Sequence, residues 1–172
     1  WELTNLATWV GFLSFLLFAP TIIAGPFFGV VIDRVNIKKF AIYTQSIIAT
    51  TVFILWFLYN FDLLNIYNLS LIALVIGIFT SADRTTRMTL VPRITDKSNL
   101  ANAIAVHGIN FNSARLIGPA LAGLLIQILN FEITIFINFL FLIAMPLTLV
   151  SITVSKKDGE PGGKKNILLE LE

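Results

Sequence analysis

Long apolar stretches, separated by short charged or polar connections, dominate the pattern along the chain. The five longest stretches without a charged residue run over 3–32, 40–61, 63–82, 98–114 and 133–155. Four of these five reach the roughly 20 residues that an α-helix needs to cross a hydrocarbon core. They do not alternate polar and apolar residues as barrel strands do, and residues 15–18 are apolar on every helix face. The pattern therefore predicts membrane-spanning helices.

The connections divide the chain into five predicted spans and a terminal segment. We expect an all-α integral membrane bundle over residues 1–154, with spans near 8–32, 40–61, 69–91, 99–129 and 133–154. Residues 155–172 are rich in lysine, glycine and acidic residues, which predicts a flexible cytoplasmic linker. Because the chain opens on Trp1 instead of Met, and ends at the start of an apparent amphipathic helix, we expect a fragment of a longer protein.

Connections with basic residues alternate along the chain with connections that have none. The stretches 1–7, 60–68 and 130–132 contain none. The stretches 33–39, 92–99 and 155–172 contain every lysine and arginine except Arg84, Arg87 and Arg115. Basic residues in short loops stay on the cytoplasmic side. The asymmetry therefore places residue 1 outside and residue 172 in the cytoplasm of a multi-pass protein of the cell (inner) membrane.

The composition excludes several kinds of chemistry. Charged residues make up 13% of the chain, about half their share in soluble domains. The net charge of +2 is explained by the basic loops, so we expect the lipid bilayer, and no nucleic acid, as a partner. With one histidine, no cysteine and no phosphate-cradling glycine motif, we expect no metal, no cofactor and no ATP hydrolysis. No catalytic residues stand out, so an enzyme is not predicted.

The most specific pattern joins the first two predicted spans. Residues 29–39 read Gly-Val-Val-Ile-Asp-Arg-Val-Asn-Ile-Lys-Lys. Glycine at the first position permits close backbone approach, and charges at a lipid boundary require partners. Asparagine suits a turn, and the two lysines anchor it to the cytoplasm. The residues that define the pattern are Gly29, Asp33, Arg34, Asn36, Lys38 and Lys39.

These residues match the loop G-x-x-x-D-R-x-[GN]-x-[KR]-[KR] at every specified position, so the chain resembles the major facilitator superfamily. In that family the loop joins the second and third of twelve helices. The resemblance implies five of the six helices of the N-terminal bundle, with the first helix missing, and makes that helix and the C-terminal half partners of the chain. It also implies that Asp33, Arg34 and Lys38 form a cytoplasmic conformational gate. The alternative is that these charges only determine topology.

Two further stretches resemble the branch of macrolide and enterobactin exporters. The segment from Arg87 to Ala103 is similar to the connection between the fourth and fifth helices of those exporters. The segment 114–123 is similar to an antiporter element of the fifth helix, in which Gly118, Pro119 and Gly123 imply a kink linked to antiport. The latter match is partial, because two alanines stand where the fuller pattern has glycine.

Four side chains inside the spans are candidate cavity or coupling residues. Asp83 and Arg87 are four residues apart, so they can pair on one helix face. Arg115 is the most interior charge, roughly 21 Å from an outer boundary at Leu129 at 1.5 Å per residue. It either snorkels to the inner surface or pairs within the structure, or it faces a cavity with Asn110 and Asn112 nearby.

The sequence thus predicts a secondary active transporter: a proton-coupled exporter of a small solute or drug that works by alternating access. Prolines inside the spans, at positions 20, 26, 119 and 146, predict bendable helices around a central cavity. The alternative is a non-transporting scaffold or assembly subunit built from a similar bundle. The substrate is not given by the sequence.

Overall fold

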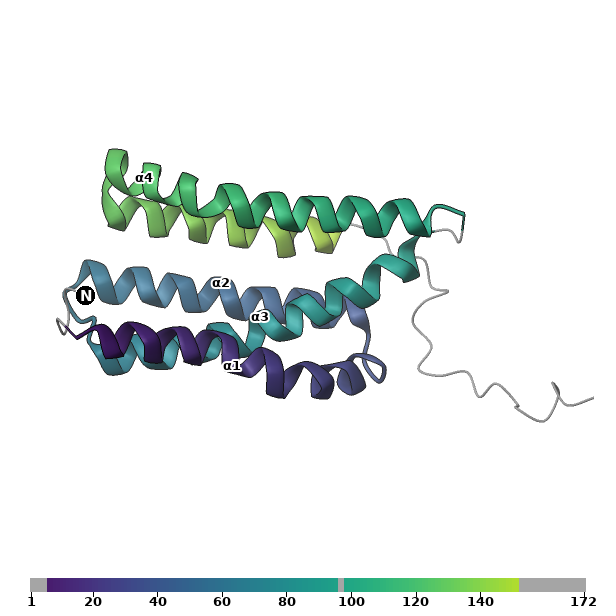
Figure 1. Cartoon of the computed structure of the whole chain (residues 1–172), viewed down its shortest axis with the longest axis horizontal. Helices are drawn as coiled ribbons and strands as arrows, with labels where there is room; N and C mark the ends of the chain where they lie inside the picture. Colours follow the sequence, from purple (N-terminus) through teal and green to yellow (C-terminus); the bar gives the residue numbers. More distant parts are fainter. Residues whose placement is uncertain (1–5, 96–97, 152–172) are drawn as a thin grey trace, which may run out of the picture.

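The computed structural model describes residues 6–95 and 98–151, and all the regular structure there is helical. Four helices follow one another: α1 (Ala7–Ile32), α2 (Ile37–Asn60), α3 (Ile66–Ile94) and α4 (Leu100–Ser151) (Figure 1). Each contains a segment long and apolar enough to cross a membrane. The predicted all-α membrane bundle is confirmed.

Helix α4 accounts for two crossings. A straight helix of its 52 residues would measure about 78 Å, more than twice the thickness of a hydrocarbon core. Asn130 breaks it with non-helical dihedrals, φ 70° and ψ 173°. The chain reverses there, and the first arm (100–129) lies beside the second arm (131–151) (Figure 1). The described helices therefore make five crossings.

Asparagine side chains begin three of the crossings. Asn36 accepts a hydrogen bond from the Lys39 N–H at 3.1 Å, and Asn65 accepts one from the Asn68 N–H at 2.9 Å. Asn130 accepts one from the Ile133 N–H at 3.1 Å. These bonds satisfy donors of the first helical turn that have no intrahelical partner. Each reversal is therefore short and locally closed.

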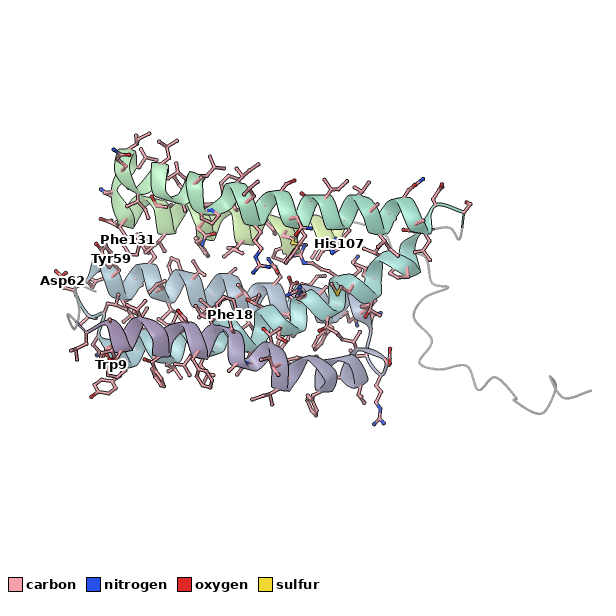
Figure 2. All side chains as sticks on the ribbon, in the orientation of Figure 1. Trp9, Phe18, Tyr59, Asp62, His107 and Phe131 are labelled. Atoms are coloured by element: carbon pink, nitrogen blue, oxygen red, sulfur yellow. The ribbon has the colours of Figure 1, made fainter. Side chains whose placement is uncertain are left out.

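The connections without basic residues share one end of the bundle. Figure 2 shows Trp9, Tyr59, Asp62 and Phe131 together at that end. The α1–α2 connection and the start of α4 lie at the opposite end (Figure 1). There the ammonium of Lys38 donates to the carbonyl of Val150 at 3.3 Å, which joins the start of α2 to the end of α4. The connections with basic residues thus lie at one end of the molecule, and those without basic residues lie at the other.

Helix α2 lies at the centre of the packing. Its buried residues are Ile37, Ala41, Thr44, Gln45, Ile48, Ala49, Thr51 and Val52. Three aromatic pairs join it to the second arm of α4, with ring centroids 5.0–5.1 Å apart: Phe53–Phe139, Trp56–Phe136 and Tyr59–Phe131. The outer surface is apolar, and Ile22 and Phe18 of α1 are 81% and 67% exposed. Such a surface requires lipid or further protein around it.

The prolines do not end the helices that contain them. Helix α1 continues through Pro20, and α4 continues through Pro119 and Pro146; Asn130 is the residue with non-helical dihedrals inside α4. Helix α1 changes direction near its middle (Figure 1). The prolines therefore remain within membrane helices. Each costs its helix one backbone hydrogen bond, and membrane helices tolerate this loss.

Helices α1 and α3 approach each other closely at Gly77, which is buried. A Cβ atom placed on Gly77 would lie 2.7 Å from the carbonyl oxygens of both Leu16 and Leu17. Because these are backbone atoms, they cannot rotate away. The absence of a side chain at this position is what allows the two helices to approach.

Replacing Gly77 with alanine is expected to destabilise the full-length protein by about 1–3 kcal/mol, since the two backbones must separate. The matched control is Gly11→Ala in α1, where a Cβ atom meets nothing within 4 Å. The measurement is the thermal unfolding midpoint of each purified variant in detergent. Equal midpoints for the two variants would contradict the close crossing.

Candidate functional site

The α1–α2 connection is a tight turn closed by the backbone on one side and a side-chain cap on the other. The N–H of Asp33 donates to the carbonyl of Gly29 at 3.3 Å, and the N–H of Arg34 donates to Val31 at 3.0 Å. Asn36 then starts α2. The side chains of Asp33, Arg34 and Lys39 are exposed, and that of Lys38 is half-buried. The turn therefore presents both signs of charge at one end of the bundle.

Gly29 behaves differently from Gly77. A Cβ atom placed on Gly29 would meet nothing within 4 Å among the described residues. No described part of the chain therefore makes the close backbone approach that was expected at Gly29. Lys38, by contrast, does reach another helix, because its ammonium bonds Val150.

A second group of charged side chains lies on α3. The Nε of Arg87 is 2.7 Å from a carboxylate oxygen of Asp83, so the expected pair at i, i+4 spacing is present. The Nη2 of Arg87 also lies 2.6 Å from the sulfur of Met145 in the second arm. The side chains of Asp83 and Arg87 are only 14% and 35% exposed. This pair therefore connects α3 to α4 in a partly desolvated position.

Arg84 faces the other arm of α4. Its guanidinium carbon lies 5.0 Å from the ring centroid of Phe111 in the first arm, a cation–π contact. The residue remains exposed. Two arginines of α3 thus contact α4, one on each arm. The sequence offered a signal for their common direction, because residues three apart share a helix face.

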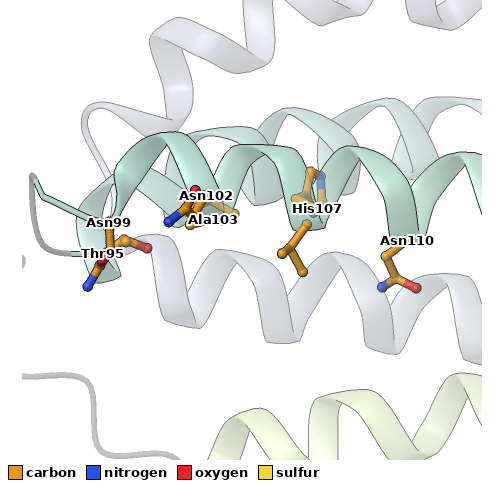
Figure 3. A pocket seen from close by; sticks show the side chains of 8 residues that line it. Thr95, Asn99, Asn102, Ala103, His107 and Asn110 are labelled. Carbon is orange, nitrogen blue, oxygen red and sulfur yellow. The ribbon is translucent and has the colours of Figure 1, made fainter.

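An open cavity of ≈ 520 Å³ lies between the end of α3 and the start of α4, at the basic end of the bundle. Its α3 wall consists of Val91 and Thr95. Its α4 wall is the first stretch of the first arm, where polar residues follow one another along the helix (Figure 3). That wall consists of Asn99, Asn102, Ala103, Val106, His107 and Asn110. Sequence reasoning missed this cavity as a unit.

The other predicted site residues lie farther along the first arm. Asn112 donates its side-chain N–H to the carbonyl of Gly108 at 2.9 Å, and Arg115 is exposed. Gly118, Pro119 and Gly123 are also exposed, and a Cβ atom on either glycine would meet nothing within 4 Å of the described chain. The predicted site residues thus occupy three places: the α1–α2 connection, the α3–α4 face and the middle of the first arm.

Comparison with known proteins identifies the family. The model of the Major Facilitator Superfamily matches residues 4–169. The chain is also similar to the Staphyloferrin A transporter of Staphylococcus aureus (strain NCTC 8325 / PS 47), with 24% identity over 123 residues. That match covers 71% of this chain and 31% of the relative, so the chain spans less than a third of the relative's length. No solved structure matches. The family match over almost the whole chain, together with five apolar crossings, shows that this multi-pass membrane chain belongs to the major facilitator superfamily.

Proposed function

We propose that the chain forms part of a secondary active transporter that exports a small solute by alternating access, driven by proton antiport. The observation that supports this best is the α1–α2 connection, where a capped turn fixes Asp33 and Arg34 at the end of α1. Membership of the superfamily and the similarity to a transporter support the transport part of the proposal. Export and antiport rest on the resemblance of 87–103 and 114–123 to exporter segments.

The turn is suited to act as a gate. Its backbone hydrogen bonds and the Asn36 cap hold the charged side chains in one place, while Lys38 contacts the far end of α4. Charges held in this way can form ion pairs with the other half of a transporter in one conformation and lose them in another. Such differential contacts are what a two-state transporter requires. Residue 1 would lie outside and this gate in the cytoplasm of the inner membrane.

We place the proposed proton coupling at the Asp83–Arg87 ion pair, because it lies between α3 and α4. When a proton binds the Asp83 carboxylate, its negative charge is lost and the ion pair with Arg87 is broken. Because Arg87 also contacts Met145, release of the guanidinium alters the contact between α3 and the second arm. Protonation at one side chain would therefore change how two helices pack. Gly118 and Pro119 would give the first arm the freedom to bend during that change.

Asp33→Asn in the full-length protein is expected to lower export by roughly 5- to 150-fold, because typical coupling free energies correspond to factors of this size. The matched control is Asp62→Asn, which removes an equal charge from the non-basic end of the bundle. Asp62 has φ 55°, a conformation that asparagine also adopts readily. The measurement is the initial rate of substrate export from preloaded cells at equal membrane expression. Unchanged export in Asp33→Asn would favour a non-transporting scaffold or assembly subunit.

Asp83→Asn is expected to separate transport from its driving force. Without a carboxylate that takes up a proton, the protein should still exchange labelled substrate across proteoliposomes but should not move it in response to a pH gradient. Both processes are measured in the same vesicles, with Asp62→Asn as the control. Retention of gradient-driven transport by Asp83→Asn would place the proton site elsewhere.

A further inference from the structure

We propose that the cavity between α3 and the first arm of α4 binds a small solute that bears carboxylate groups. This inference rests on the proposed transport function and names the substrate class of the same protein. It begins from a spacing on α3: Arg84, Arg87 and Val91 follow at intervals of three and four residues, and Thr95, four residues farther on, is the residue that caps the end of the helix. Residues at this spacing lie on one face of a helix. Val91 and Thr95 line the cavity, so the two arginines continue the same face.

The contacts of the arginines confirm that direction. Arg84 lies on the ring of Phe111, the residue that follows the cavity-lining Asn110. Arg87 reaches Met145 in the second arm. Both guanidinium groups therefore reach from α3 to α4, on the helix face that leads to the cavity-lining Val91.

The charge at this place is not balanced. Asp83 pairs with Arg87, and within residues 6–95 and 98–151 no carboxylate pairs with Arg84. A cation–π contact uses none of the guanidinium N–H groups in bonds to oxygen, so Arg84 retains its planar set of donors. Charged groups inside a membrane span are expensive unless they find a partner. A carboxylate, which accepts two parallel N–H bonds from a guanidinium, is the partner of matching geometry.

The rest of the cavity complements such a solute. Asn99, Asn102 and Asn110 provide carboxamides that donate and accept hydrogen bonds, and His107 adds an imidazole. None of the described residues that line the cavity is acidic. Its volume of ≈ 520 Å³ lies within the range of small-molecule sites. The cavity therefore has room for a solute of modest size, and its carboxamides and imidazole can form hydrogen bonds with that solute.

The test uses the full-length transporter in nanodiscs of phosphatidylcholine, with succinate and citrate as anionic probes. Succinamide, which matches succinate in size but carries no charge, is the ligand control. Calorimetric titration should show saturable binding of both carboxylates and none of succinamide. Arg84→Gln should weaken binding by roughly 10- to 100-fold, because charge-assisted hydrogen bonds are lost. Arg84→Lys, which retains the charge, should bind more tightly than Arg84→Gln.

Three results would overturn the proposal. One is binding of succinamide as tight as that of succinate. Another is equal carboxylate affinity in the wild type and in Arg84→Gln at unchanged thermal stability. The third is a complete absence of carboxylate binding, including the case in which phosphatidylglycerol stabilises the protein through Arg84, since a lipid headgroup would then be the anion.

The binding test is independent of the transport test. If no carboxylate binds while Asp33→Asn still lowers export, the anion site is wrong and the transporter remains. If carboxylates bind through Arg84 while neither the wild type nor any variant moves a solute, the site remains and the transport function is wrong.

Discussion

Each backbone N–H and C=O group that enters hydrocarbon must find its partner inside the protein, and the whole structure depends on this requirement. It forces the apolar segments into helices and confines the breaks between them to their ends. At those ends Asn36, Asn65 and Asn130 supply the side-chain oxygens that the first helical turns need. Hydroxyl groups within the spans, as in Thr44 and Thr86, donate to carbonyls of their own helix. Short polar turns between long apolar helices are the result.

The same requirement applies to charge, and there it leads toward function. Asp83 and Arg87 satisfy each other on α3, and Arg87 also contacts α4. Arg84 has an aromatic ring and no described counterion. A bundle built only for stability would gain little from such a residue, because a buried or membrane-embedded charge costs free energy without a matching partner. The proposed conformational coupling and the proposed anionic solute would both give these charges a role.

Much of the fold could be predicted from the sequence because lipid imposes simple rules. The apolar stretches and the connections between them predicted five crossings. The connection expected at 130–132 coincides with the reversal at Asn130 inside α4. The spacing of Asp83 and Arg87 was enough to expect their ion pair. The first residue of each helix was harder to predict. Helix α2 begins at Ile37, before the apolar span expected from Phe40, because Asn36 caps a first turn that contains both lysines.

Contacts between helices could not be predicted in this way. Gly77 looks like any other membrane-helix glycine until its backbone neighbours Leu16 and Leu17 are known. The positions of Phe111 beside Arg84 and of Met145 beside Arg87 depend on the rotation of each helix about its axis. A single sequence gives the period of a helix and leaves that rotation undetermined. The roles of the loop residues, of Arg115 and of Gly118 stay predictions for the same reason.

The sidedness of the connections is measured most directly by thiol labelling, since this chain contains no cysteine. Leu63→Cys and Ser98→Cys place single thiols at exposed positions on opposite ends of the bundle, in a full-length protein freed of other cysteines. A membrane-impermeant maleimide should label Leu63→Cys in intact cells and Ser98→Cys only after the membrane is opened. Labelling of both thiols in intact cells, or of Ser98→Cys alone, would contradict a five-crossing bundle with its charged gate in the cytoplasm.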